Sequence, residues 1–249
     1  MLDDLIVRSS NWESVLYPLK MAASLKGLEA DTTQGSPPDF GLCEAAASYD
    51  AAHSQAASGY VSGLIVFSFV WWAWEATKDM TQFGVALTRG KSNRRAVLSG
   101  LTAGLCEHLP GLRTVLDETL DLCQQAGDFA DELKKLELID TSDAQRAADL
   151  ARRFRNYVFH GDDQVPMPDD WDDEGVAAKK DTPAGILRFY AMSRLVLMLI
   201  QLALFSEISN RNAVISVAGP FSEGRPAGEH VVALQLEYCG PEGDQLLLL

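Results

Sequence analysis

The sequence YVSGLIVFSFVWWAW, residues 60–74, is apolar nearly all the way round when it is wound into an α-helix. A helix without a polar stripe normally lies at the centre of a bundle, with other helices around it. The apolar runs 61–74 and 195–205 contain 14 and 11 residues, fewer than the roughly 18 to 20 that cross a bilayer. We therefore expect a mainly α-helical protein whose central helix covers residues 60–87 and which does not span a membrane.

Segments on both sides of this helix have the composition or periodicity of further helices. They cover residues 12–28, 42–57, 92–107, 111–126, 128–138, 143–160 and 183–208. Residues 213–217 and 231–238 are instead β-branched or alternating, with Gly and Pro between them, which predicts a small β-hairpin. The expected organisation is an N-terminal helix and loop at 1–40, a helical bundle at 41–210 and a C-terminal β-hairpin or tail at 211–249.

The formal net charge of −14 has the wrong sign for a protein that binds nucleic acid with its whole surface. The charge is unevenly distributed, however. Seven carboxylates lie within 13 residues that contain no Lys or Arg: Asp162, Asp163, Asp169, Asp170, Asp172, Asp173 and Glu174. Two basic clusters contain Arg89, Lys91, Arg94 and Arg95, and Arg146, Arg152, Arg153 and Arg155. The sequence is therefore compatible with a local RNA-binding surface and not with a large one.

The four cysteines lie far apart and form no C-x-x-C pair, and the chain begins with an acidic rather than a basic and apolar segment. Without a disulfide framework or a signal peptide, we expect a reduced, cytoplasmic protein. Cys106-Glu107-His108 resembles a metal-ligand pair, but no second pair follows it. We therefore expect neither a metal site nor a cofactor.

The helix predicted at 143–160 has unusually clear signals at both ends. Ser142 and Gln145 match a capping box, and Gly161 is a natural C-terminal stop. At about 100° per residue, one face of the helix is apolar. This face carries Ala147, Leu150, Ala151, Phe154, Tyr157 and Val158. We expect it to be buried, with Phe154 at its centre.

The remaining surface of this helix carries Arg155, Asn156 and His160. Asn156 and His160 are four positions apart and share a face, whereas Arg155 lies about 140° round from His160. Arginine holds phosphate oxygens with a planar fork of donors, and histidine transfers protons near neutral pH. One helix does not place both groups on a single phosphate, but two copies packed across this face would.

Phe159 projects about 140° from the centre of the buried face, where a lone helix in water is normally polar. Three interpretations remain open at this point. The ring packs against another helix of the same chain, forms a dimer seam, or offers a surface on which an RNA base stacks.

The pattern Arg155-Asn156-x-x-x-His160-Gly161, at the end of a late helix, resembles the R-x4-6-H signature of the HEPN superfamily. It looks most like the subgroup with a polar residue after the arginine. The earlier segment FSFVWWAWEA, residues 67–76, also resembles the aromatic, Glu-containing helix that often precedes this signature. The resemblance covers about residues 42–208 and leaves out the first 40 residues and the C-terminal hairpin.

This resemblance implies a HEPN-like helical bundle that dimerises, with the motif helices of two protomers forming one cleft. Many such proteins are metal-independent endoribonucleases, often bacterial toxins or defence components. Several are paired with a nucleotidyltransferase-type antitoxin. Others have lost catalysis and act as binding or scaffold modules.

The residues also suggest how such a site would cleave RNA, whose 2′-hydroxyl is the nucleophile. His160 would act as general base or acid, Arg155 would hold the non-bridging oxygens, and Asn156 would orient His160 or a phosphate oxygen. The expected products are a 2′,3′-cyclic phosphate and a 5′-hydroxyl, without Mg²⁺. The candidates for supporting or RNA-binding roles are Arg152, Arg153, Glu75 and Phe159.

Other interpretations use the same residues differently. An Arg and a His near a helix end are common surface, salt-bridge or capping groups, and the chain is then a catalytically silent HEPN-like module that binds a protein partner or nucleotide. A helical protein without a nucleic-acid role is a third interpretation. Glu75, in an apolar helix, is expected to need a partner such as Arg155, because an unpaired buried carboxylate is costly.

The acidic stretch 162–174 begins directly after the motif and also has more than one interpretation. It is a solvated loop, or an anionic gate that competes with RNA for Arg152, Arg153 and Arg155. A divalent-metal site is a third interpretation, although the spacing of an EF-hand is absent.

Overall fold

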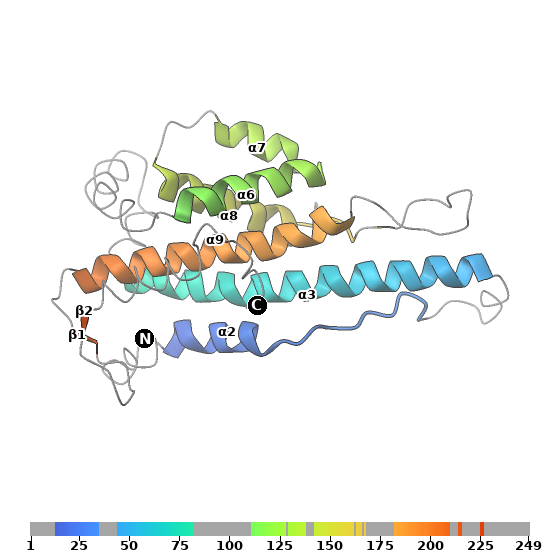
Figure 1. The fold of residues 1–249 in the computed structure, drawn as a ribbon, viewed down its shortest axis with the longest axis horizontal. Helices are drawn as coiled ribbons and strands as arrows, with labels where there is room; N and C mark the ends of the chain where they lie inside the picture. Colours follow the sequence, from blue (N-terminus) through green and yellow to red (C-terminus); the bar gives the residue numbers. More distant parts are fainter. Residues whose placement is uncertain are drawn as a thin grey trace.

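The structure is a computed structural model. It describes residues 13–34, 44–81, 111–127, 129–137, 142–161, 163–165, 167, 182–209, 214–215 and 225–226. These residues form six helices: α2 Glu13–Ser24, α3 Glu44–Met80, α6 Gly111–Ala126, α7 Ala130–Glu137, α8 Asp143–Phe159 and α9 Thr182–Ser209 (Figure 1). The prediction of a mainly α-helical protein is confirmed.

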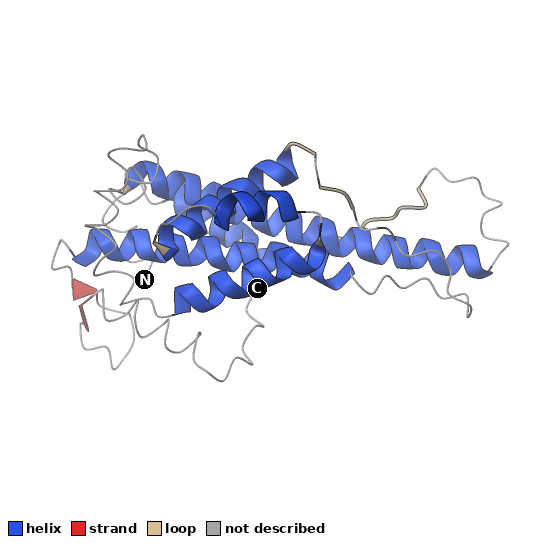
Figure 2. Ribbon diagram, turned by 90° about the horizontal axis from the view of Figure 1, so that it is seen from above, coloured by secondary structure: helices blue, strands red, loops and turns tan. Residues whose placement is uncertain are grey.

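Two long helices, α3 and α9, lie side by side along the length of an elongated bundle (Figures 1 and 2). Helix α2 packs on the other side of α3, and α6, α8 and α7 lie on the side of α9. The N-terminal part of α3 extends past the start of α9, with the chain that follows α2 running beside it (Figure 1). The motif helix α8 therefore packs on a scaffold made by the two longest helices.

Close contact between α3 and α9 depends on two glycines one turn apart. A Cβ atom on Gly59 would lie 2.9 Å from Cδ1 of Ile186, and one on Gly63 would lie 2.9 Å from Cβ of Phe189. Because Gly59 meets Ile186 and Gly63 meets Phe189, the two helices run in the same direction. At Gly63 the neighbour is a Cβ atom fixed by the backbone of α9, so a larger residue there would push the helices apart, whereas at Gly59 the neighbour is the end of a flexible side chain.

The core beside this contact is aromatic. Phe154 of α8 is fully buried and meets three rings edge-on, with centroid distances of 5.2 Å to Phe67, 5.8 Å to Phe129 and 5.3 Å to Phe189. Edge-to-face packing is the arrangement that aromatic rings favour, because the positive edge of one ring meets the negative face of the next. Five of the six residues of the predicted face are buried, and Tyr157 is partly buried. Phe154 joins α8 to α3, to α9 and to the residue just before α7.

The segment that follows α2 is held along α3 by a ladder of serines. Three backbone N–H groups of the segment donate to serine Oγ atoms on α3. The pairs are Leu28 with Ser62 at 2.9 Å, Ala30 with Ser58 at 2.8 Å and Thr32 with Ser54 at 3.1 Å. Four helical residues rise about 6.0 Å and two extended residues about 6.6 Å, so the two spacings match. Three amides of the extended chain are thereby satisfied without a neighbouring β-strand.

Several predicted helix boundaries need correction. The helices predicted at 42–57 and 60–87 are one continuous helix, Glu44–Met80. The helices predicted at 111–126, 143–160 and 183–208 are confirmed to within one residue at each end. The predicted helix at 92–107 lies outside the described residues.

At the C-terminus, strand β1 Val214–Ile215 pairs antiparallel with β2 Arg225–Pro226. The predicted hairpin placed its second strand at 231–238, which lies outside the described residues. The pairing that is described therefore uses an earlier segment than the predicted one.

The longest helices are less enclosed than the sequence suggested. Trp72 of α3 is 58% exposed and stacks on Phe69 with its centroid 6.5 Å away. Residues Ala46–Met80 of α3 and Ala184–Leu204 of α9 are each long and apolar enough to cross a bilayer, although 50% and 61% of their most apolar windows are buried inside the protein. Length and composition therefore do not by themselves distinguish core helices from membrane-spanning ones, because each helix is longer than its uninterrupted apolar run.

Candidate functional site

The motif helix α8 begins and ends as its sequence predicts. The Oγ atom of Ser142, at the N-cap, accepts from the N–H of Gln145 at 3.4 Å. At the other end the N–H of His160 donates to the carbonyl of Asn156 at 2.9 Å, and Gly161 has φ +81°. Glycine adopts this left-handed conformation without steric cost, so the chain turns away from the helix directly after His160.

Three of the candidate side chains form a group at this end of α8. Nη1 of Arg155 donates to Oδ1 of Asn156 at 3.2 Å. The guanidinium carbon of Arg155 also lies 5.4 Å from the ring centre of Phe159. Phe159 is 48% exposed rather than covered by another helix of the chain. The group is therefore a cation held over an aromatic ring at the protein surface.

His160 is exposed directly after this group, at the first residue beyond the helix. Among the contacts of the described residues, none joins the imidazole of His160 to Arg155. The structure thus places the two side chains at the same end of α8 without bringing them together within one chain.

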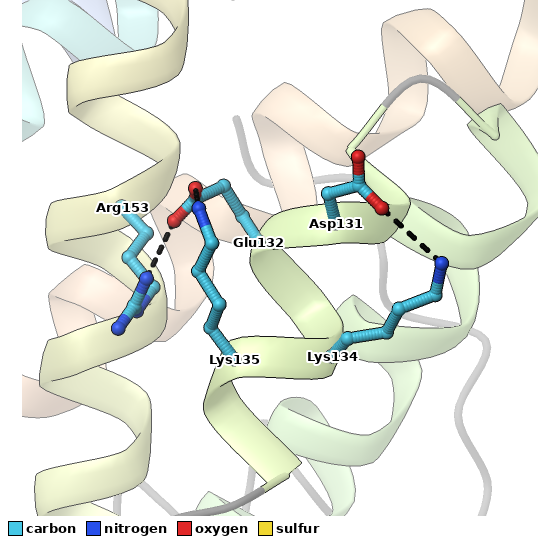
Figure 3. A network of polar contacts seen from close by, with 5 residues as sticks. All are labelled: Asp131, Glu132, Lys134, Lys135 and Arg153. Atoms are coloured by element: carbon cyan, nitrogen blue, oxygen red, sulfur yellow. Dashed lines mark hydrogen bonds and ion pairs between the residues drawn. The ribbon is translucent and has the colours of Figure 1, made fainter.

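The two other arginines at this end of the helix have carboxylate partners. Arg152 lies 3.8 Å from Asp149. Arg153 donates to Glu132 of α7 at 2.5 Å, and Glu132 also binds Lys135 (Figure 3). Their charges are therefore matched within the chain, whereas the described contacts of Arg155 are with an amide and a ring.

Glu132 is the point at which α7 is tied to α8. Figure 3 shows its carboxylate between Arg153 and Lys135, with the separate pair of Asp131 and Lys134 on the far side of α7. The hydrogen bond from Lys135 is the largest effect on the pKa of Glu132 and lowers it below its usual range; burial opposes this shift, and the hydrogen bond from Arg153 adds to it. The carboxylate form is the one that both cations stabilise.

The sequence had suggested Arg155 as a partner of Glu75, but the partner in the structure is a different residue. Its carboxylate lies 2.8 Å from Nζ of Lys78, one turn later on α3, and the side chain is 47% exposed. Lys78 in turn lies 5.5 Å from the ring centre of Trp71. Glu75 was expected to be buried because its neighbours in the sequence are apolar, but this side of α3 is exposed to solvent.

A buried charged network lies just beyond His160, and sequence analysis missed it. Asp163 accepts from Tyr60 of α3 at 3.0 Å and from Nη2 of Arg188 of α9. The side chains of Arg188 and Asp163 are only 2% and 0% exposed. Arg188 also donates through Nε to the carbonyl of Gly185 at 3.1 Å. We call Asp163, Arg188 and Tyr60 the Asp163 anchor.

The anchor is packed against the aromatic core. The guanidinium carbon of Arg188 lies 5.8 Å from the ring centres of both Phe154 and Phe189. Burial, followed by the negative charge of Asp163, raises the pKa of the Tyr60 hydroxyl. Tyr60 therefore stays protonated and remains a donor to the carboxylate.

The anchor corrects the view of residues 162–174 as a uniformly solvated acidic loop. Asp163 is a buried partner of Arg188, while residues 162, 166 and 168–174 lie outside the described residues. The signal that could have found it was Arg188 itself, a cation within an apolar helix that requires a carboxylate. Composition alone does not say which of seven acids supplies it.

A pocket of about 190 Å³ lies between α6, α7 and α8. It is lined by Asp117, Leu120, Asp121, Gln124, Leu133 and Arg146. Arg146 is nine residues before Arg155, which is roughly 14 Å along the helix. The motif is thus a surface site and not part of this pocket. Across the described ranges, no three His, Cys, Asp or Glu side chains gather as metal ligands.

Comparison of the chain with protein families, with curated proteins and with solved structures gives no match. What the site does must therefore be argued from its own residues.

Proposed function

We propose that this protein is a HEPN-like endoribonuclease that cleaves single-stranded RNA without a metal ion. The observation that carries the proposal is the state of Arg155. Among its described contacts no carboxylate neutralises it, and Asn156 and Phe159 hold it at the surface, five residues before the exposed His160. A cation that is held but not neutralised is suited to a phosphate.

The reaction needs proton transfer and charge stabilisation at phosphorus. One His160 takes the proton of the 2′-hydroxyl, whose oxygen attacks the adjacent phosphorus. A protonated His160 gives a proton to the departing 5′-oxygen as the P–O bond breaks. Arg155 binds the non-bridging oxygens while negative charge builds on them. The products are a 2′,3′-cyclic phosphate and a 5′-hydroxyl, and DNA, which lacks the 2′-hydroxyl, is not cleaved.

Asn156 has a more specific role in this proposal than the sequence suggested. Its Oδ1 atom accepts from Arg155, which fixes the guanidinium group. Its Nδ2 group can then donate to a phosphate oxygen or to His160 of the same face. A lone Arg155 on a flexible side chain would lose more entropy on binding RNA.

The enzyme is proposed to act as a homodimer, with motif helices from two protomers lining one cleft. Phe159, nearly half exposed beside Arg155, is the apolar surface that such a seam would cover. Within one chain the described contacts do not join Arg155 and His160, so a second copy would supply the missing neighbour. A cytoplasmic toxin or defence component, paired with a nucleotidyltransferase-type antitoxin, is the setting that the HEPN resemblance implies.

The second candidate function is a catalytically silent HEPN-like module that binds a protein partner or nucleotide. The net charge of −14 favours it, and so does the pairing of Arg152 and Arg153 with carboxylates of the same chain. Both observations reduce the positive surface on which RNA would lie.

The deciding experiment incubates labelled single-stranded RNA with purified protein in EDTA. Wild type is compared with Arg155→Ala, His160→Ala and the control Arg113→Ala, which removes an exposed arginine of α6 that has no part in the proposed site. We expect the first two variants to lose at least about 100-fold in rate and the control to keep its activity. The wild-type product should end in a cyclic phosphate.

The other outcomes have separate meanings. Equal cleavage by all four proteins would identify a contaminating nuclease and remove the proposal. Absence of cleavage by wild type would favour the silent module. Light scattering of the same samples tests the dimer, and Phe159→Ser should weaken it.

A further inference from the structure

We propose that Asp163 is a positioning residue, which fixes the backbone of His160 through its buried contacts with Arg188 and Tyr60. The catalytic consequence rests on the proposed ribonuclease function, whereas the structural consequence does not. Asp163 itself is buried and would not touch RNA.

Only a short stretch of chain separates His160 from Asp163. Gly161 and residue 162 are all that separate His160 from Asp163. With about 3.8 Å between successive Cα atoms, His160 stays within roughly 11 Å of wherever Asp163 is held. On its other side His160 is bonded to the end of α8, through its N–H and the carbonyl of Asn156. The exposed histidine is therefore restrained from both directions.

Two helices of the bundle hold Asp163. Tyr60 belongs to α3 and Arg188 to α9, and both bind the carboxylate in the interior. Arg188 also lies against the ring of Phe154, which belongs to α8. Asp163 is thus linked to α8 in two ways: through the chain by way of Gly161 and His160, and through Arg188, which contacts Phe154. The turn is thus fixed relative to the helix that carries Arg155.

The burial of this ion pair also has an energetic consequence. Charged side chains that are only 0% and 2% exposed cost much desolvation energy, and an ion pair with apolar neighbours is a poor means of adding stability alone. What such a pair supplies is a unique geometry, because charge and hydrogen bonds are satisfied in only one arrangement. A catalytic histidine must be held to within about 0.5 Å of its productive position, and this requirement accounts for the placement of the anchor three residues beyond it.

The test removes the anchor without leaving a buried charge. Asp163→Ala would leave the buried Arg188 cation without its carboxylate and could unfold the protein. The informative variant is therefore Asp163→Asn/Arg188→Met, which removes both charges. The matched control is Arg194→Met, which removes another α9 arginine, bound to Glu118 at 3.2 Å. Circular dichroism and melting curves establish that all the proteins fold.

The first readout does not need RNA. NMR order parameters of the His160 and Gly161 amides should fall from about 0.85 to below about 0.6 in the double variant and stay at the wild-type value in the control. Unchanged order parameters in a folded double variant would overturn the proposal.

The second readout is the kinetics of RNA cleavage. The double variant should lose roughly 10- to 100-fold in kcat, because a displaced catalytic group slows the chemical step, while KM changes little. A loss confined to KM would contradict positioning. If wild-type protein does not cleave RNA, the ribonuclease proposal fails, and the order parameters still decide whether Asp163 fixes the turn.

Discussion

Gly59 and Gly63 provide a matched pair of substitutions at the scale of single residues. Alanine at either position gains about 0.5–1 kcal/mol of helix propensity. At Gly63 the new methyl is too close to Cβ of Phe189, which the backbone of α9 fixes, whereas at Gly59 the atom that is too close is the terminal Cδ1 of Ile186, which can rotate away. We therefore expect Gly63→Ala to lower the free energy of unfolding by about 1–3 kcal/mol and Gly59→Ala to leave it nearly unchanged.

Urea denaturation of both variants measures this difference. Equal free energies for the two variants would show that α9 moves as a whole to accommodate either methyl. In that case the glycines would not define the distance between α3 and α9.

The same scale shows what the sequence could predict about the site. The surface positions of Arg155, Asn156 and His160 follow from helix periodicity, because all three lie outside the buried face centred on Phe154. The partner of Asp163 could not be predicted in this way. Tyr60 lies 103 residues before it and Arg188 25 residues after it, so only the packing of three helices brings the anchor together.

At the scale of elements, the serine ladder makes a prediction about the segment after α2. Ser58→Ala removes the Oγ atom that accepts from the N–H of Ala30 at 2.8 Å. A lost hydrogen bond of about 1 kcal/mol corresponds to roughly fivefold faster opening. Hydrogen exchange at the Ala30 amide should therefore quicken by about that factor, measured by NMR under native conditions.

Ser68→Ala is the matched control, because Ser68 donates only to the carbonyl of Leu64 within α3. It should leave exchange at Ala30 unchanged. Equal acceleration by both substitutions would mean that the helix, and not the ladder, was perturbed.

The ladder and the close contact with α9 also explain why α3 is one helix where two were predicted. Gly59 costs about 1 kcal/mol in a helix interior relative to alanine, which is a reasonable signal for a boundary. On α3 this cost is offset by contacts with residues that are distant in sequence, Ile186 on one side and the segment at residues 28–32 on the other. A prediction from local sequence cannot include those contacts, so it places a helix boundary at Gly59.

At the scale of the whole molecule, apolar composition predicted the bundle but not how completely each helix is covered. Helix α9 carries Arg188 and Arg194, and both have carboxylate partners, Asp163 and Glu118, from other parts of the chain. A bilayer would not supply these partners, and a lone arginine in it is costly. The paired arginines therefore favour α9 as a core helix of a bundle, although α3 and α9 are long enough to span a membrane.

The stability of the protein in acid depends in part on how α7 is joined to this bundle. The pKa of Glu132 is lowered in the folded protein by Lys135 first and Arg153 second. Below its ordinary pKa of about 4.3 the unfolded chain binds the proton more readily, so unfolding becomes easier as pH falls. The stabilisation is fully present above that value and is lost as pH falls through the lowered pKa. Glu132→Gln should therefore cost stability at neutral pH and progressively less in acid.

The difference in unfolding free energy between wild type and Glu132→Gln, measured by urea denaturation from neutral pH into the acidic range, checks this directly. Many other carboxylates of this acidic chain, whose net charge is −14, titrate in the same range. Subtracting the free energy of the variant from that of wild type removes their common contribution. Lys135→Met should shrink the pH-dependent difference, whereas Lys134→Met, which removes the partner of Asp131 on the same short helix, should not. A difference that is independent of pH would show that Glu132 titrates alike in both states, and that apolar contacts such as those of Phe129 and Leu133 hold α7 to the bundle.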